Sequence, residues 1–233
     1  MTQEREIQVE GKNVTVTVSD DQKTLLAAKA AGRVVVGYLH DGGDQELSAA
    51  EYLIGSPDGA DERYLERVVR RQLGLPWVIG ESERLVIREF TLDDVSKVVK
   101  EDCDLEADTV FYTQDKLEAY IKGQYRFYEY GMWAVFRKED GVLVGKAGVC
   151  SAEDGRLELG YHMFTPYRRR GYAVEACRMI LDFVEQELLC PVYAVTNPAN
   201  EASRSVLSKL GFRFIRQRYN ESGQLQYLYG WNC

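Results

Sequence analysis

The sequence predicts an α/β (α+β) protein built as two blocks, and three observations lead to that prediction. Short apolar segments with the two-residue alternation of strands occur along the whole chain, and segments with helical spacing lie between them. A polar stretch at residues 80–83 separates a small first block, residues 1–80, from a longer second block, residues 84–233. Hydrophobic residues make up 45% of the 233 positions, which is enough for each block to bury a core.

The first block is predicted to be a small three-layer α/β unit. Its expected elements are strands at 13–18, 34–39 and 52–54 and helices at 24–31 and 61–73. Valine and threonine alternate in the first strand, and the second strand is almost entirely apolar, as buried strands are. Asp20 and Asp21 form a turn and a helix cap before the alanine-rich first helix, which Gly32 ends.

The second block is predicted to contain elements in the order β α α β β β α β α β β. The expected strands are 84–90, 132–137, 142–149, 156–164 and 192–196, and the expected helices are one that begins at Thr91 and those at 115–130, 174–188 and 200–210. Asp-Gly turns at Asp140-Gly141 and Asp154-Gly155 join neighbouring strands into hairpins, and a last hairpin turns across residues 220–223.

The charge balance limits the classes of ligand and partner. The chain has 29 basic and 37 acidic residues and a net charge of −8, so it lacks the general footprint of a nucleic-acid-binding protein and mildly favours a cationic acceptor. No apolar run approaches the ~18 residues of a membrane span, and the polar start of the chain contains no apolar leader. A soluble, cytoplasmic protein is expected.

Cysteine and histidine give no sign of a metal site. The five cysteines show no CxxC spacing and are expected to be free thiols in a reducing compartment. They are Cys103, Cys150, Cys177, Cys190 and Cys233. His40 and His162 have no partners at metal-ligand spacing, so both are interpreted as incidental and no metal is expected.

A basic turn with a glycine lies between the expected strand 156–164 and the expected helix 174–188. It reads Tyr167-Arg168-Arg169-Arg170-Gly171-Tyr172-Ala173. The first amides of a helix have no partners within the helix and carry partial positive charge, so this turn is a natural phosphate site. Gly171 permits close approach of the backbone, and the three arginines add full charges. On an acidic chain, this pattern favours a small anionic ligand.

These residues resemble the GNAT superfamily of N-acetyltransferases. Arg168-x-x-Gly171-x-Ala173 fits the family's [QR]-x-x-G-x-[GA] signature, and it follows a strand and opens a helix. Glu158-Leu159-Gly160-Tyr161 precedes it, and Asn200-Glu201-Ala202-Ser203 and Lys209-Leu210-Gly211-Phe212 follow, as in the ribosomal-protein acetyltransferase branch. The resemblance covers residues 84–233 and implies a mixed, mostly antiparallel twisted sheet flanked by helices.

The resemblance also implies acetyl-CoA as co-substrate. The pyrophosphate is expected on the backbone amides of residues 169–174, and the 3′-phosphate on one or more of the three arginines. The pantetheine arm is expected to enter between the strand end 163–165 and strand 192–196, like an added strand. The implied coenzyme-binding residues are Met163, Phe164, Thr165, Arg168, Arg169, Arg170, Gly171, Tyr172, Ala173 and Asn200. Asn200 is equally well explained as a helix cap.

Two side chains are candidates for the chemistry. Glu158 is the carboxylate nearest the expected reaction centre, and partial burial would raise its pKa toward that of a base for the amine. Its alternative is an outward-pointing strand acid, because Leu157, Leu159 and Tyr161 alternate onto the opposite face. Many family members carry a leaving-group tyrosine where this chain has Leu207. In the branch that this chain most resembles, a serine at the position of Ser203 is assigned the role of protonating the leaving group. Ser203 is equally well explained as a solvated serine at a helix start.

The acceptor side is less specified. The aromatic helix 115–130 and residues 109–112 correspond to the acceptor region of the family, but Tyr120, Phe127 and Trp133 have the spacing of core residues. The leading hypothesis is N-acetylation of a protein N-terminus or a small amine by direct attack. The alternative is an acyl-CoA-binding or sensor module. In either case, residues 1–80 are a candidate surface for a protein partner or a second copy.

Overall fold

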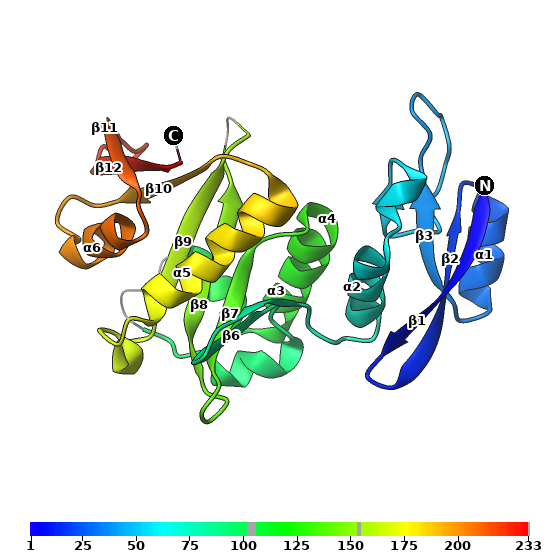
Figure 1. Cartoon of the computed structure of the whole chain (residues 1–233), viewed down its shortest axis with the longest axis horizontal. Helices are drawn as coiled ribbons and strands as arrows, with labels where there is room; N and C mark the ends of the chain where they lie inside the picture. Colours follow the sequence, from blue (N-terminus) through cyan, green and yellow to red (C-terminus); the bar gives the residue numbers. More distant parts are fainter. Residues whose placement is uncertain (102–105, 153–154, 233) are drawn as a thin grey trace. The chain divides into compact units, whose positions relative to one another are not determined.

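The computed structural model describes residues 1–101, 106–152 and 155–232 (Figure 1). The chain divides into two compact units, Met1–Trp77 and Val78–Cys233. The stretch 80–83 is therefore not a plain linker, because residues 80 and 81 end a strand of the second unit. Cys103, Cys233 and Asp154 of the expected Asp154-Gly155 turn lie outside the described residues. No helix in the described part of the chain is long and apolar enough to span a membrane.

The first unit is a four-stranded sheet with a helix on each face. Its strands are β1 (Thr2–Val9), β2 (Lys12–Ser19), β3 (Val34–Tyr38) and β4 (Leu53–Ile54), and its helices are α1 (Gln22–Ala30), α2 (Glu62–Gln72) and a 3₁₀ turn (Pro57–Gly59). The strand order is β1-β2-β3-β4, with β1 and β2 antiparallel and the others parallel. The larger apolar cluster contains Leu65 and Val68 of α2, and the smaller contains Leu25 and Ala28 of α1, so the predicted three layers are present.

Strand β1 was not expected from the sequence. Only Ile7 and Val9 of its eight residues are buried, and its charged residues hide the strand alternation. Pairing with β2 through the turn at Glu10 and Gly11 supplies the hydrogen bonds that make it a strand. The caps are as predicted: the side chain of Asp21 accepts a hydrogen bond from the Thr24 amide at 2.8 Å at the start of α1.

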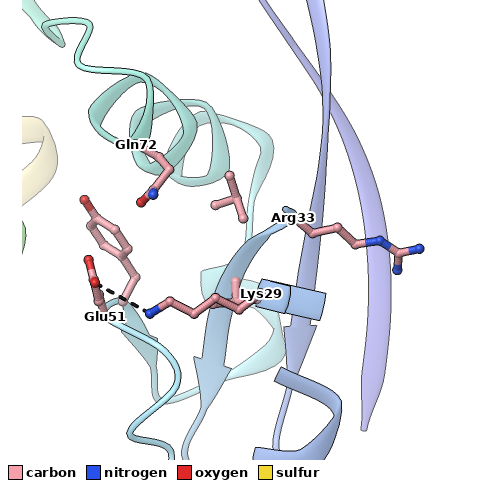
Figure 2. Close-up of a pocket in the computed structure, with 7 residues that line it drawn as sticks. Lys29, Arg33, Glu51 and Gln72 are labelled. Carbon is pink, nitrogen blue, oxygen red and sulfur yellow. Dashed lines mark ion pairs between the residues drawn. The ribbon is translucent and has the colours of Figure 1, made fainter. Parts of the chain in front are cut away.

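The first unit also contains a small pocket (Figure 2). Its volume is about 40 Å³, which is room for a few waters and not for a coenzyme. Lys29 and Glu51 point toward each other across it, with 3.7 Å between the Nζ and Oε1 atoms. Arg33 points away and forms an ion pair with Glu4. This pocket is therefore not a candidate for the phosphate-binding chemistry that the sequence predicts.

The second unit is built on an eight-stranded sheet. Its strands are β5 (Val78–Glu81), β6 (Leu85–Arg88), β7 (Met132–Arg137), β8 (Leu143–Ser151), β9 (Leu157–Met163), β10 (Val192–Thr196), β11 (Arg213–Tyr219) and β12 (Leu225–Trp231). Its helices are α3 (Gln114–Tyr120), α4 (Arg126–Tyr128), α5 (Tyr172–Phe183) and α6 (Glu201–Lys209). The order is β11-β12-β10-β9-β8-β7-β6-β5, and only β9 and β10 are parallel. The mixed, mostly antiparallel sheet is confirmed.

Helices cover both faces of the sheet around strands β6 to β9. Helix α5 crosses in the foreground of Figure 1, and Phe183 at its end packs edge-on against Trp133 of β7, with ring centroids 5.3 Å apart. The expected helix 115–130 is interrupted by a π turn at Ile121–Tyr125, and the expected helix 174–188 ends in a π turn at Val184–Leu188. Further 3₁₀ turns are Leu92–Lys97, Glu106–Tyr112 and Thr165–Tyr167.

A buried carboxylate anchors the segment that follows β6. Asp94 is fully buried, and its carboxylate oxygens accept hydrogen bonds from Arg88 at 2.7 and 2.9 Å and from Lys97 at 2.9 Å. The backbone amide of Thr91 donates to the same carboxylate at 2.9 Å and closes the predicted helix-start cap. Burial alone would raise the pKa of Asp94, but these donors outweigh it and lower the pKa to about 2.

Replacing Asp94 with asparagine should destabilise the second unit by about 3 kcal/mol near neutral pH, because the half-buried Arg88 would lose the buried carboxylate that balances its charge. The folded-state pKa lies below the unfolded one, so the wild type should lose this stabilisation as pH falls from about 4 toward about 2. Denaturant unfolding at several pH values measures both effects. The exposed neighbour Asp93, replaced with asparagine, is the control, and equal losses in the two variants would contradict the prediction.

Candidate active site

The predicted phosphate loop ends in a glycine that the backbone requires. Gly171 has φ +82° and Arg169 has φ +60°, so the chain turns twice through the left-handed region before α5 begins. Gly171 occupies the N-cap position and supplies no capping side chain. No hydrogen-bond acceptor for the amides of residues 172–174 is found among the described residues. Free amides at the positive end of a helix are the arrangement that anion sites typically use.

The start of α5 is held against β6 by Arg84. Its guanidinium forms an ion pair with Glu175, lies 4.9 Å from the centre of the Tyr172 ring and donates to the backbone oxygen of Arg170 at 3.1 Å. Ser82 donates to the other oxygen of Glu175 at 2.5 Å. A groove of about 320 Å³ lies here, lined by Glu83, Arg84, Arg137, Lys138, Glu139 and Tyr172. The loop is thus held beside a groove lined by charged residues of both signs.

Arg168 differs from its two neighbours in being held by the protein. Its Nε donates to the backbone oxygen of Met163 at 2.8 Å, and its guanidinium lies 2.7 Å from a carboxylate oxygen of Glu101. The same oxygen lies 2.7 Å from Nε2 of His162, and the other accepts from the Thr165 amide at 2.6 Å. His162 is therefore not incidental, because it shares the carboxylate of Glu101 with Arg168. Arg168 holds the loop in place, and the exposed Arg169 and Arg170 extend from that loop.

Glu101 is a site residue that the sequence did not indicate. Burial alone would raise its pKa, but hydrogen bonds from Thr165 and His162 and the charge of Arg168 outweigh it and lower the pKa to about 2. The carboxylate is therefore ionised throughout the physiological range. Its hydrogen bonds connect the segment after β6 with the end of β9 and with the phosphate loop. The partner residues lie 61 to 67 positions later in the sequence.

The cleft of this site is the gap between the edges of β9 and β10 where the two strands cease to pair. Leu157 pairs with Val192, and Glu158 pairs with Tyr193. No further pair joins the two strands, all of whose residues the structure describes. Beyond this point the facing edges of β9 and β10 carry backbone groups that the sheet does not use. Strand edges with free backbone groups are the kind of surface to which an extended, amide-containing ligand can add as a strand. The strand end 163–165 leads directly to the loop before α5.

Glu158 lies at the last paired position before the cleft. The register places its side chain on the face opposite Leu157, Leu159 and Tyr161, as predicted. The residue is half-buried, and burial raises the pKa of its carboxyl group. A hydrogen bond from Tyr193 and the charge of Arg218 oppose that rise. Glu158 is therefore a carboxylate of increased basicity beside the cleft, and not a plain surface acid.

Helix α6 brings two hydroxyl groups together on the other face. Asn200 is the N-cap, and its Oδ1 accepts from the Ser203 amide at 3.0 Å, so its cap role is confirmed. The hydroxyl of Ser203 lies 2.9 Å from that of Tyr161, at the end of β9. Burial raises the pKa of Tyr161 to about 12. Tyr161 is a second site residue to which the sequence analysis assigned no role. Leu207, at the position of the family's tyrosine, is fully buried in the core.

Comparison with known proteins decides the family. The model of the acetyltransferase (GNAT) domain matches residues 84–213, which is 130 of the 233 residues. The chain belongs to the GNAT acetyltransferase family. An uncharacterised N-acetyltransferase of Bacillus subtilis, YjdG, is 30% identical over 83 residues, 34% of this chain and 49% of that protein. The chain thus aligns with about half the length of this curated relative.

Solved structures share the GNAT fold. An acetyltransferase from Bacillus anthracis is 22% identical with a TM-score of 0.54, and covers 66% of this chain and 98% of its own. The ribosomal-protein-S5-alanine acetyltransferase from Vibrio fischeri is 15% identical with a TM-score of 0.53, over 67% and 96%. RimL, a ribosomal L7/L12 acetyltransferase solved with coenzyme A, is 14% identical with a TM-score of 0.56, over 66% and 97%.

The aromatic residues of the expected acceptor region divide into two groups. Trp133 is fully buried, and the hydroxyl of Tyr120 accepts from the Met132 amide at 2.6 Å, so both belong to the core as predicted. Phe127 is 78% exposed, and its assignment to the core was wrong, because α4 is a single turn that the core does not cover. Within the described residues, no group of three or more metal-ligating side chains is arranged to hold an ion.

Replacing Glu101 with glutamine should loosen the loop between β9 and α5. The Thr165 amide donates to this carboxylate at 2.6 Å, so its hydrogen exchange should accelerate about tenfold when the charged acceptor is lost. Exchange followed by mass spectrometry or NMR measures the effect. Glu221, in an exposed turn, serves as the control when replaced with glutamine. Unchanged protection at Thr165 in the Glu101 variant would show that the carboxylate does not hold the loop.

Proposed function

We propose that the protein is an acetyl-CoA-dependent N-acetyltransferase that transfers the acetyl group to a primary amine by direct attack. The observation that carries this proposal is the continuity of the cleft between β9 and β10 with the phosphate loop before α5. A coenzyme with a pyrophosphate at one end and an amide-rich arm at the other matches these two features in order. Family membership supports the reaction class.

The donor end of the site is assigned residue by residue. The pyrophosphate would lie on the amides of residues 169–174, with Gly171 permitting close approach. Exposed Arg169 and Arg170 are the cations for the 3′-phosphate, whereas Arg168 supports the loop through Glu101. Tyr172 and Ala173 open the helix. This assignment keeps all the predicted loop residues but gives Arg168 an indirect role.

The arm of the coenzyme would run along the strand end. The backbone oxygens of Met163, Phe164 and Thr165 and the amides of Phe164 and Thr165 already have partners in the protein. The arm would therefore pair with the edge of β9 that precedes this strand end and pass alongside these three residues, with Asn200 at the start of α6 as a further contact. Because the Oδ1 of Asn200 is used for the cap, its amide nitrogen is the group that faces a ligand. The cap and a coenzyme contact are therefore compatible in one side chain.

The chemistry needs a base, a nucleophile and a proton for the leaving group. The amine nitrogen attacks the thioester carbonyl, the carbon–sulfur bond breaks, and the amine proton passes to Glu158 directly or through water. The pKa of Glu158, raised by burial, suits this role. Ser203 would hydrogen-bond the departing thiolate, with Tyr161 behind it at 2.9 Å. A coenzyme thiol with a pKa near ~8.5 needs only modest help.

The acceptor is a protein N-terminus or a small amine. Two of the similar structures are acetyltransferases of ribosomal proteins, which supports the N-terminus. The alternative function, an acyl-CoA-binding or sensor module, keeps the same donor site but uses no acceptor. A role for residues 1–80 in binding a protein partner or a second copy stays a prediction.

Acetyl-CoA should raise the melting temperature of the wild-type protein, because a ligand that binds only the folded state stabilises it. Replacing Gly171 with aspartate should abolish the shift, since a side chain at φ +82° is strained and its charge repels the pyrophosphate. Gly223, at φ +73° in a distant hairpin turn, gives the matched control when replaced with aspartate. Thermal shift assays measure this, and no shift with the wild type would remove the coenzyme assignment.

Acetyl-CoA and a panel of amines should release free thiol, and replacing Glu158 with glutamine should slow release about 100-fold. The rate should fall as pH drops through the raised pKa of Glu158, because only the ionised carboxylate accepts a proton. Replacing Arg218 with glutamine should move that fall to higher pH, since its charge lowers the same pKa. Coenzyme binding without thiol release from any amine would favour the sensor module.

A further inference from the structure

The outer strand of the sheet presents arginines on the face that carries Glu158. Side chains of directly paired residues project from the same face of a sheet. Glu158 of β9 pairs with Tyr193 of β10. Tyr193 pairs with Gly230 of β12, and Gly230 pairs with Arg213 at the start of β11. Arg213 therefore lies on the Glu158 face, three strands away across the sheet.

A β-bulge adds two more arginines to this face. Arg213 and Arg216 are an odd number of residues apart, so in a regular strand they would point to opposite faces. The register shifts between Phe214 and Arg216, which inserts one residue and restores the alternation. Arg216 then pairs with Leu228, and Arg218 with Gln226. Because every second residue of β12 shares a face, the arginine row (Arg213, Arg216 and Arg218) lies entirely on the Glu158 face.

The charges of the arginine row are not balanced. None of the three guanidinium groups has an acidic partner within ion-pair distance among residues 1–101, 106–152 and 155–232. Arg213 and Arg216 are exposed, and Arg218 is half-buried and donates to the side-chain oxygen of Gln226 at 3.2 Å. Many other arginines of this acidic chain, such as Arg84 and Arg88, do form ion pairs.

The Glu158 face of this part of the sheet is not covered by α5 or α6. Both helices lie on the opposite face, where Ser203 of α6 contacts Tyr161 and Phe183 of α5 contacts Trp133. Arg213 and Arg216 thus lie exposed on the same face of the sheet as Glu158, and Arg218 lies half-buried on that face. Unpaired cations on an open face attract an anionic ligand.

We propose that the arginine row binds acidic side chains of a peptide acceptor whose amino terminus reaches Glu158. The inference rests on the proposed function. Three steps between neighbouring strands span about 14 Å, and an extended chain covers that distance in about four residues. Acidic residues about four positions behind the amino terminus would therefore meet the row, where guanidinium and carboxylate form bidentate hydrogen bonds.

The geometry favours this acceptor over the other classes. A small amine cannot contact Glu158 and the arginine row at once, and a polyamine would be repelled by the row. The net charge of −8 opposes a long nucleic acid, which would also have to approach acidic surface. The cationic acceptor expected from the overall charge is thus replaced by an acidic one, because the local charge at the site is opposite to that of the whole chain.

The test compares three peptides of equal length and equal first residues that carry glutamate, glutamine or lysine about four positions behind the amino terminus. With saturating acetyl-CoA, kcat/KM should be highest for the glutamate peptide, by about tenfold over the glutamine peptide, which matches a few exposed ion pairs. The double replacement Arg213→Gln and Arg216→Gln should remove this preference through KM, and high salt should weaken it. Arg178→Gln, at an exposed position of α5, should keep it.

Equal kcat/KM for the three peptides, or a preference that survives the double replacement, would overturn the proposal. Inhibition by a short RNA without preference among peptides would point instead to nucleic acid. Fluorescence anisotropy of a labelled glutamate peptide gives a readout that does not need turnover. If no amine is acetylated, the proposed function fails. The binding role of the arginine row is then tested separately: it is supported if the double variant loses peptide binding and rejected if peptide binding survives.

Discussion

The separation of β9 from β10 is the constraint on which the whole site depends. Two parallel strands that pair at only two positions leave facing edges of backbone groups without sheet partners. The gap is kept open from outside, because β9 pairs with β8 along its full length and β10 pairs with β12 along its full length. The sheet therefore consists of two halves joined at Leu157 and Glu158. Such a gap selects a ligand with its own hydrogen-bonding backbone, such as the amide-rich arm of a coenzyme.

The two sides of the gap are held in place by different kinds of interaction, one charged and one neutral. On the β9 side, the ionised Glu101 holds Arg168 and Thr165, so a charged network in a partly buried position orients the phosphate loop. On the other side, neutral hydrogen bonds join Asn200 and Ser203 of α6 to each other and Ser203 to Tyr161 of β9. A charged network suits this loop, because it holds Arg168 in place before any ligand arrives and leaves the exposed Arg169 and Arg170 as the cations for a phosphate. Neutral hydroxyls suit the side where a thiolate is to form, because they can donate without adding charge.

Local sequence signals predicted what local physics decides. The turn at Gly171 and the caps at Asp21 and Asn200 depend on nearby residues, and all are present. Glu101 and Tyr161 were missed because their partners are 64 and 42 positions away, and no short pattern records such a contact. The bulge in β11 was equally hidden, since the register of a strand depends on its neighbour. Strand β1 was not predicted for the same reason, because its pairing with β2 makes it a strand and its own charged residues do not show this.

The electrostatics of Glu158 connect the two ends of the site. Burial raises its pKa, whereas Arg218 lowers it, so the same arginine row that faces an acceptor also keeps the carboxylate closer to ionised. A cationic acceptor would be attracted by Glu158 but repelled by the arginine row. An acidic acceptor places its carboxylates on the row and leaves its terminal amine to face a single base. Direct attack requires that amine to be neutral, so separating the two charges along about four residues of peptide favours the reaction as well as the binding.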